Sequence, residues 1–463
     1  MIGSVICRLM GPGNRLDNDG RVELKMPTNN FEQSQKYFKK ALNKQKSGDA
    51  VAAESFYKRA LRYNANHLDA NYLLGTLYAE RREFANALKF LKVAAEINPH
   101  SHMVQNNLGN IYQMTGRFDD AIACYQQALN IDPNMPEVYN NLGNILKNQD
   151  KLDEAESYHR RALLLRPDFV QCYCNLGGVL SKLKKFSESI DSFHKAIELS
   201  PNYKQAYEGL GVCYKDHGET AKAIECFKRY LEIDPSDDNE VNLRLALLKA
   251  GEMPARYPVV TMMTTYEKKA ENWDLDILRP GSEFLGPQHV HEMLQKLRLV
   301  SNHQLDVLDI GCGTGVCGEY LRGYAKLLEG VDLSPHMLEQ AKKKGLYDKL
   351  YCDDAINFMK NCPHTFDVIV ASGVLILFGD LKEVFQTASN ILNPDGYFVF
   401  TLYRSEIDAI AVRHNLHFSH SETYIRDTAS AAGLKVDRCD QEIHEFELGE
   451  AQSGWLVALR KSN

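Results

Sequence analysis

The feature that most constrains the fold is a repeat in the first half of the chain. A Leu-Gly pair recurs every 34 residues, from Leu74-Gly75 to Leu210-Gly211, and most copies close on a proline such as Pro99 or Pro133. Small residues let two antiparallel helices approach closely, and proline cannot continue a helix. This period therefore predicts a solenoid of stacked helix pairs.

The period and its residues resemble tetratricopeptide repeats, and six copies are expected over residues 34–237. The first copy is atypical because Lys40-Ala41 replaces the Leu-Gly pair and Ala65 replaces the proline. A terminal repeat is expected to depart from the pattern in this way. Residues 1–33 are expected to be weakly ordered.

A glycine-rich turn follows an apolar run in the second half of the chain. The stretch reads Leu308-Asp309-Ile310-Gly311-Cys312-Gly313-Thr314-Gly315. Alternate glycines let the backbone approach a ligand closely, but a dinucleotide fingerprint would need glycine where Val316 stands. About twenty residues later, Asp332 ends the next apolar run, where a carboxylate can accept hydrogen bonds from ribose hydroxyls.

Two further apolar runs each end at a residue that could contact a ligand. Asp353-Asp354-Ala355 follows the third run, and Ala371 ends the fourth. Ser334 and Pro335 suit the cap and first position of a helix. Asp353 or Asp354 could instead cap the helix that begins at Ala355, and Asp332 could be a solvated strand end.

In this order, the motifs resemble class I S-adenosylmethionine-dependent methyltransferases. The span from about Leu245 to Lys461 resembles a family of predicted methyltransferases with N-terminal tetratricopeptide repeats. This resemblance implies that the segment containing Tyr266 folds over the cofactor. The resemblance implies an α-solenoid followed by a Rossmann-like domain with a seven-stranded, mostly parallel sheet. It also implies S-adenosylmethionine as cofactor, bound by Asp309, Gly311, Cys312, Gly313, Gly315, Asp332, Leu333, Met337, Asp353, Asp354, Ala355 and Ala371.

The expected domain limits follow from these two halves. A capping helix and linker are expected over residues 238–262, and the methyltransferase domain over 263–463. Parallel strands are expected near 306–311, 328–333, 349–353, 366–371 and 396–403. Two further strands are expected at Cys439–Phe446 and Trp455–Arg460, the last of them antiparallel.

Methyl transfer from such a cofactor depends mainly on orientation, so a dedicated base is not required. If the acceptor must lose a proton, the candidate bases are His420, His417 and Tyr266. The spacing His414-x-x-His417-x-x-His420 could suggest a metal. No Cys or acid nearby completes a tetrahedral set, so no metal is expected.

Charge and cysteine content limit the partners and the compartment. The formal net charge of −7 gives no general attraction to nucleic acid or to anionic membranes, so neither is expected as a partner. The eleven cysteines contain no C-x-x-C pair, and neither an export signal nor a membrane-spanning run is evident. A cytoplasmic protein with reduced thiols is expected.

The repeats predict a protein or peptide partner on their concave surface. Asn107, Asn141 and Asn175 share one position in three successive repeats, and they resemble the asparagine-lined solenoid of the O-linked N-acetylglucosamine transferases. These amides could bind a peptide backbone or could bond across neighbouring helices. The leading hypothesis is a methyltransferase that recruits a protein or peptide. The alternatives are a small-molecule methyltransferase and a non-catalytic scaffold that senses the cofactor; the oligomeric state and the acceptor atom are left open.

Overall fold

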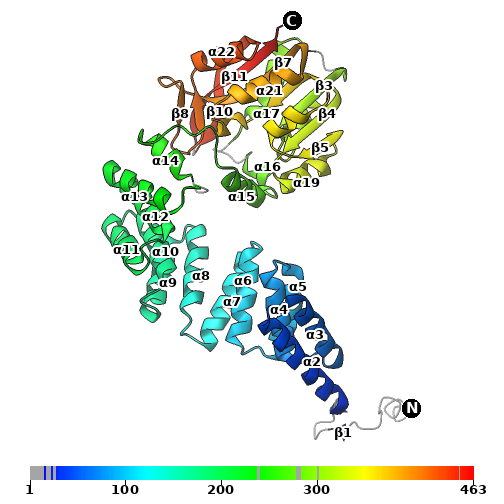
Figure 1. Cartoon of the computed structure of the whole chain (residues 1–463), viewed down its shortest axis with the longest axis vertical. Helices are drawn as coiled ribbons and strands as arrows, with labels where there is room; N and C mark the ends of the chain where they lie inside the picture. The colour runs from blue at the N-terminus through cyan, green and yellow to red at the C-terminus, as the bar shows by residue number, and fades with distance from the viewer. Residues whose placement is uncertain are drawn as a thin grey trace, which may run out of the picture. The chain divides into compact units, whose positions relative to one another are not determined.

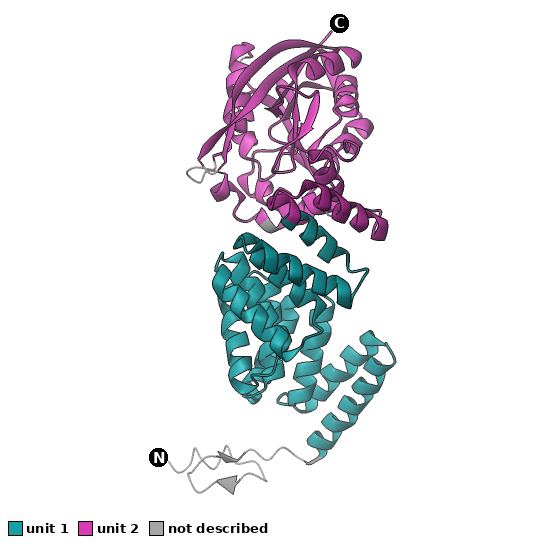
Figure 2. Ribbon diagram, turned by 90° about the vertical axis from the view of Figure 1, so that its left-hand side faces the viewer, with its two compact units in different colours: residues 1–213 teal, residues 214–463 magenta. Residues whose placement is uncertain are grey.

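The computed structural model describes most of the chain, in two compact units. Its described residues are 28–236, 240–277, 283–299, 302–447 and 449–462, with the short strands β1 (Arg15–Leu16) and β2 (Val22–Glu23). The units are Met1–Cys213 and Tyr214–Asn463 (Figure 2). Most of the segment 1–33 lies outside the described residues, although its last six residues already belong to the first helix. The domain limits expected from the sequence stay predictions.

Unit 1 is a stack of antiparallel helix pairs, which confirms the predicted solenoid (Figure 1). Its helices are α2 (Thr28–Lys46), α3 (Ala50–Tyr63), α4 (Leu68–Glu80), α5 (Phe84–Ile97), α6 (His102–Met114), α7 (Phe118–Ile131), α8 (Pro136–Asn148), α9 (Leu152–Leu165), α10 (Val170–Lys182), α11 (Phe186–Leu199) and α12 (Lys204–Asp216), which runs past the unit limit.

The repeated glycine is required by the packing within each helix pair. A Cβ atom on Gly109 would lie 2.6 Å from the Tyr125 ring, and one on Gly143 would lie 2.7 Å from the His159 ring. The ring or aliphatic side chain on the second helix therefore fills the space left by the glycine on the first. The repeat alanines, such as Ala128, are fully buried at the same contacts.

Unit 2 contains the predicted parallel sheet with seven strands in the order β10-β11-β7-β6-β3-β4-β5. Only β11 runs antiparallel to its neighbours, β7 and β10. A short pair, β8 and β9, extends the sheet beside β7. The strands are β3 (Leu305–Ile310), β4 (Ala325–Asp332), β5 (Lys349–Cys352), β6 (Phe366–Ala371), β7 (Leu392–Arg404), β8 (Ile410–Val412), β9 (Phe418–His420), β10 (Leu434–Glu447) and β11 (Glu450–Lys461).

Helices cover both faces of this sheet, and alternate strand residues supply the two cores. Val307 belongs to the core beneath α17 and α18, whereas Leu308 belongs to the core beneath α20, α21 and α22. The helices of unit 2 are α13 (Thr220–Ile233), α14 (Val241–Leu247), α15 (Val259–Lys269), α16 (Trp273–Asp276), α17 (Gly286–Lys296), α18 (Val316–Leu321), α19 (Pro335–Lys344), α20 (Ala355–Asn361), the short η1 (Leu375–Leu377), α21 (Lys382–Ile391) and α22 (Glu422–Ala431). No helix among the described residues has the length and apolarity needed to cross a bilayer.

Candidate functional site

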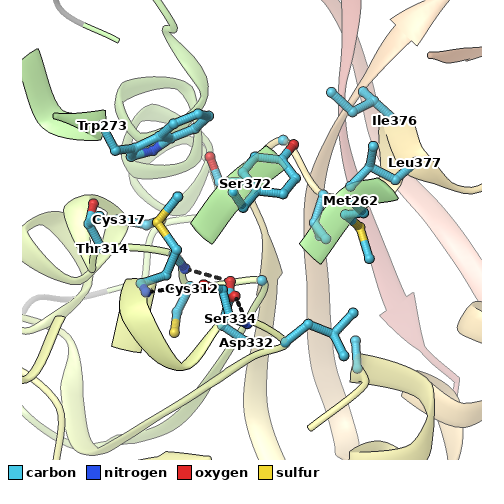
Figure 3. A pocket seen from close by; sticks show the side chains of 18 of the residues that line it. Met262, Trp273, Cys312, Thr314, Cys317, Asp332, Ser334, Ser372, Ile376 and Leu377 are labelled. Carbon is cyan, nitrogen blue, oxygen red and sulfur yellow. Dashed lines mark hydrogen bonds between the residues drawn. The ribbon is translucent and has the colours of Figure 1, made fainter. Parts of the chain in front are cut away.

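A cavity of about 320 Å³ opens at the carboxyl ends of the parallel strands in unit 2. In an open α/β sheet, ligands bind at this edge, where the strand order reverses. Figure 3 shows side chains from the glycine turn, from the end of β4 and from the loop after β6 around this space. Of the predicted cofactor-binding residues, those that line it are Gly311, Cys312, Gly313, Asp332, Leu333, Met337, Asp353, Asp354 and Ala355.

The glycine turn brings bare backbone to the cavity. Gly311 and Gly313 have φ angles of 68° and 54°, a region that side chains disfavour. A Cβ atom on Gly311 would lie 2.7 Å from the Cβ of Val374, so the turn packs closely against the loop after β6. At Gly313, by contrast, no described heavy atom lies within 4 Å of the Cβ position. The space beside Gly313 therefore belongs to the cavity.

Asp332 is held rigidly at the end of β4. Its two carboxylate oxygens accept hydrogen bonds from the backbone N–H groups of Gly313 at 2.9 Å and Ser334 at 2.8 Å (Figure 3). Burial raises the pKa of Asp332, and these two bonds oppose the shift. An ionised carboxylate can accept about four hydrogen bonds, so Asp332 keeps capacity for a ligand in the cavity.

The acids after β5 divide their roles. Asp354 caps α20 by accepting from the backbone of Ile356 and Asn357, and it also pairs with Arg256 at 2.9 Å. Asp353 accepts two bonds from the side-chain amide of Asn357. Asp354 therefore caps the helix, as one of the two interpretations of the sequence expected. Both Asp353 and Asp354 also line the cavity.

Three predicted cofactor residues lie behind the cavity instead of in its lining. Asp309 is buried, and it accepts a hydrogen bond of 2.6 Å from the Tyr347 hydroxyl. Burial raises the pKa of Asp309 to about 7. Gly315 caps α18, and Ala371 is fully buried at the end of β6. These residues shape the turn and the sheet edge beneath the site.

Residues 256–277, here called the covering segment, close one side of the cavity. The segment begins at a bridge between Arg256 and Phe378, where the Tyr257 N–H donates to the Leu377 carbonyl at 2.8 Å. It carries α15 and α16, and Tyr266 meets the Trp273 ring edge-on at 5.4 Å. Both rings line the cavity. This arrangement agrees with the expected fold of the Tyr266 segment over the site.

The covering segment is also tied to the glycine turn. Asp274 accepts a hydrogen bond from the Thr314 hydroxyl and pairs with Lys344 at 2.7 Å. Lys344 in turn lies 3.3 Å from Glu319 on α18. The family resemblance includes a Tyr-x-x-x-Ala-x-x-Trp-Asp pattern from Tyr266 to Asp274, but the sequence assigns no contact to Trp273, Asp274 or Thr314.

The three histidines of the His414-x-x-His417-x-x-His420 pattern lie in three different environments. His414 pairs with Glu447 at 3.2 Å, and His417 lines the cavity. His420 is fully buried outside the lining, with its Nε2 atom 3.0 Å from the Gly379 carbonyl. Burial lowers the pKa of both His417 and His420 to about 4. His420 therefore has the contacts of a structural residue, and its role as a base stays a prediction.

Tyr266 and His417 remain candidates by position, since both reach the cavity. Burial and the charges of Asp332 and Glu445 raise the pKa of Tyr266 to about 12. The Nδ1 atom of His417 is buried and has no hydrogen-bond partner among the described residues. Within the same residues, no group of three or more His, Cys, Asp and Glu side chains is placed to hold a metal ion.

Glu445 is a lining residue that the sequence did not reveal. It lies on β10, is half-buried, and accepts a hydrogen bond from the buried Tyr403 hydroxyl. Arg413 stacks on the Tyr403 ring at 4.4 Å. No motif marks this residue, because its place depends on pairings between distant strands.

The three repeat asparagines bond across neighbouring repeats. Asn107 donates to the Tyr72 hydroxyl at 3.1 Å, Asn141 to Asn110 at 3.1 Å, and Asn175 to Asn140 at 2.9 Å. All three are half-buried. Asn141 also donates to the Tyr125 hydroxyl at 3.4 Å, so its amide makes two bonds within the solenoid, whereas Asn107 and Asn175 make one each.

Known protein families match both parts of the chain. The family described as a methyltransferase domain matches residues 283–438, which contain the glycine turn and Asp332. Tetratricopeptide repeat families match residues 44–111, 109–150, 136–169, 170–203 and 205–237. The chain carries a methyltransferase domain preceded by tetratricopeptide repeats.

Individual relatives resemble the methyltransferase domain alone. Ribosomal protein L11 methyltransferase of Staphylococcus haemolyticus is 27% identical over 31% of this chain and 47% of that protein. Methyltransferase-like protein 27 of Homo sapiens is 33% identical over 24% and 45%. Ubiquinone biosynthesis O-methyltransferase of Xylella fastidiosa is 26% identical over 31% and 66%. The chain spans about half the length of the curated relatives it matches.

Two solved structures are similar to part of this chain. One is YrrB, described as a TPR protein with an unusual peptide-binding site, with 21% identity over 41% of this chain and 96% of that one, at a TM-score of 0.36. Another is MamA, with 24% identity over 37% and 93%, at a TM-score of 0.34.

Proposed function

We propose that the chain is an S-adenosylmethionine-dependent methyltransferase and that its repeats recruit a protein or peptide. The observation that carries the first half is the pairing of Asp332 with the open Gly313 backbone at one cavity. The turn spacing disfavours a pyrophosphate ligand, while a fixed carboxylate beside exposed backbone suits a nucleoside. The methyltransferase domain match lies on these same residues.

The residues present fit such a cofactor. Asp332 offers unused acceptor sites for ribose hydroxyls, and the missing Cβ of Gly313 leaves room for close approach. Met337 and Leu333 give apolar walls for an adenine ring, with Asp353 and Ala355 at its edge. S-adenosylmethionine supplies an activated methyl group, so the protein must orient the acceptor and exclude water.

The protein's own residues can supply both of those functions. The covering segment places Tyr266 and Trp273 over the cavity, which shields the site from solvent. The hydrogen bond from the Thr314 hydroxyl to Asp274 holds that cover against the turn, and the ion pair of Asp274 with Lys344 joins it to α19. Good orientation of two reactants can contribute about 7–11 kcal/mol to lowering the barrier.

The proposed recruitment by the repeats rests on the solenoid and its polar positions. Stacked helix pairs present an extended surface of the kind that binds peptides. Asn107, Asn141 and Asn175 form one row on successive first helices. Each amide keeps its carbonyl oxygen as an acceptor, and Asn107 and Asn175 also keep a second hydrogen. Their bonds across repeats hold the row in place for contact with a peptide backbone.

Transfer of label from S-adenosylmethionine with a tritiated methyl group tests this proposal. The full chain is incubated with a cell extract, and the products are separated by size. We expect tritium in protein bands. Tritium confined to the small-molecule fraction would overturn the recruitment of a protein and leave the transfer activity intact.

A small-molecule acceptor is the second candidate. The relatives include both a ribosomal protein methyltransferase and a ubiquinone biosynthesis O-methyltransferase, so methyltransferases similar to this domain differ in the size of their acceptors. In that case the repeats would serve assembly, and variants of the asparagine row would leave turnover unchanged.

A further inference from the structure

The far end of the cavity carries a polar cluster that binding of a nucleoside at Asp332 would not use. Glu445 and Tyr403 lie at the β7 side of the sheet, and Asp332 ends β4. In the sheet order, β3 and β6 separate β7 from β4, so about 14 Å lies between the two strands at roughly 4.8 Å per step. Tyr266 lines the same cavity, and the charges of both Asp332 and Glu445 raise its pKa.

A β-bulge directs Glu445 into the cavity. The pairing of β10 with β11 shifts between Ile443 and Glu445, so His444 is the extra residue. A bulge of this kind re-aims the side chain that follows it, and bulges are frequent beside active sites. His444 is buried against Tyr403 at 4.7 Å and Phe284 at 5.4 Å, whereas Glu445 lines the cavity.

The backbone around Glu445 is held from both sides. Besides its ladder with β11, it forms a bridge with Phe284. The Leu285 N–H donates to the His444 carbonyl at 3.2 Å, and the Phe446 N–H donates to the Glu283 carbonyl at 2.9 Å. A carboxylate fixed in this way is preorganised for one position in the cavity.

The side chain of Glu445 is oriented by Tyr403. The Tyr403 hydroxyl donates to one carboxylate oxygen, and the Asn415 amide donates to that hydroxyl at 3.5 Å. Burial raises the pKa of Glu445, and the bond from Tyr403 opposes the shift. A carboxylate with a raised pKa accepts a proton more readily than an ordinary one. The lowered pKa of His417 makes that imidazole the weaker base.

We propose that Glu445 is the proton acceptor for methyl transfer, and that the acceptor substrate carries an O–H or N–H group that must lose its proton. This inference rests on the proposed function. As the acceptor oxygen or nitrogen bonds to the methyl carbon, the electron pair of the breaking carbon–sulfur bond stays on sulfur. The acceptor proton passes to Glu445, so one positive and one negative charge disappear together.

The ionisable groups around Glu445 set its pH dependence. A base must be deprotonated to act, so the rate should rise with pH through the Glu445 pKa. Arg413 and the Tyr403 hydroxyl favour the ionised form, and Glu447 disfavours it. The groups that face Glu445 from the neighbouring elements are Tyr403, Arg413, Glu447, Tyr266 and His417.

The first test compares Glu445→Gln with Glu450→Gln, an exposed acid on the same hairpin. The rate of tritium transfer from S-adenosylmethionine into the cell extract should fall at least about 100-fold for E445Q only. The Kd for S-adenosylmethionine, measured by calorimetry, should stay within about threefold of wild type in both. Tyr403→Phe should retain turnover but move the acidic limb of the pH–rate profile to higher pH. A wild-type rate in E445Q would overturn the inference.

A second readout needs no acceptor. The titration is made below the midpoint of the acidic limb of the pH–rate profile, where Glu445 holds a proton. A bound sulfonium near Glu445 should then favour release of that proton, whereas neutral S-adenosylhomocysteine should not. Calorimetry in buffers of different ionisation enthalpy should therefore show more proton release with S-adenosylmethionine, and E445Q should abolish the difference. Persistence of the difference in E445Q would contradict the inference alone. A wild-type chain that binds neither compound would contradict the proposed function itself.

Discussion

Some polar residues of unit 2 stabilise the fold, some contact the cavity, and some do both. Asp332 does both, because its oxygens bind two backbone N–H groups and still face the cavity. Asp309 and His420 serve the interior, and Glu445 faces the acceptor end. Residue type alone does not separate these cases.

His420 provides a direct test of this distinction. The change His420→Gln disturbs a buried bond to the Gly379 carbonyl, so we expect it to lower the free energy of unfolding of unit 2 by about 1–3 kcal/mol. The two tryptophans of the chain, Trp273 and Trp455, both belong to unit 2, so their fluorescence reports its unfolding. Affinity for S-adenosylmethionine should be unchanged. A loss of affinity without a loss of stability would contradict the structural assignment.

The same variant tests the origin of acid sensitivity. In the fold, the pKa of His420 is lowered to about 4 from an ordinary value of 6.5. The unfolded chain then binds more protons than the fold between these values, so stability is lost as pH falls from 6.5 towards 4. Denaturation curves over this range should show a shallower loss for H420Q than for wild type. Equal slopes would mean that His420 is not buried in its neutral form.

The candidate site could be predicted from sequence only where a local motif carries it. Gly311, Gly313 and Asp332 sit in a turn and a strand end whose order along the chain is diagnostic, and they line one cavity. Glu445 could not be found in this way, because a bulge between two distant strands sets its direction. The buried contact of His420 could not be predicted either, because its partner, Gly379, lies 41 residues away.

At the scale of elements, variants of the glycine turn can separate an effect on stability from an effect on ligand binding. Gly313→Ala and Gly345→Ala both place a side chain at positive φ with no described atom within 4 Å of its Cβ. Each should cost about 1–2 kcal/mol of stability from backbone strain. Only Gly313 lines the cavity, so only G313A should weaken binding of S-adenosylmethionine, as measured by calorimetry. Equal affinities for the two variants would show that this turn does not contact the ligand.

The repeats offer a second prediction at this scale. His159 takes the place that Tyr125 and Phe193 hold in the adjacent repeats, and its Nε2 atom has no hydrogen-bond partner among the described residues. Burial lowers its pKa to about 4. His159→Phe should therefore stabilise unit 1 by about 1 kcal/mol, since an unpaired buried polar atom is removed. Circular dichroism during thermal unfolding should show a higher midpoint; a lower one would indicate overpacking against Gly143.

Elements set by short-range pattern were predictable, and those set by pairing were not. The five parallel strands and the helices between them follow from apolar runs and caps such as Ser334 before Pro335. The pair β8 and β9 lacks any such signal, because three-residue strands depend on the edge of β7 for their hydrogen bonds. The bulge in β10 is invisible for the same reason.

At the scale of the whole molecule, the proposal joins a recruiting solenoid to a transfer site in one chain. Replacement of Asn107, Asn141 and Asn175 by alanine should reduce tritium in protein bands while the Kd for S-adenosylmethionine stays unchanged. The matched control replaces Asn86, Asn130 and Asn202, which are exposed in the same solenoid. Because the first three amides also bond across repeats, circular dichroism must show that the helices persist. Undiminished protein labelling would contradict a role for this row.

The most direct test of the central claim is calorimetric titration of S-adenosylmethionine into the full chain and into Asp332→Asn. The wild type should bind one molecule, and D332N should bind about 10–100-fold more weakly, because hydrogen bonds to a charged group contribute about 1.5–3 kcal/mol. Glu339→Gln, an exposed change on α19, should bind as wild type does. Absence of binding by the wild type, or equal affinity in D332N, would contradict the assignment of this cavity.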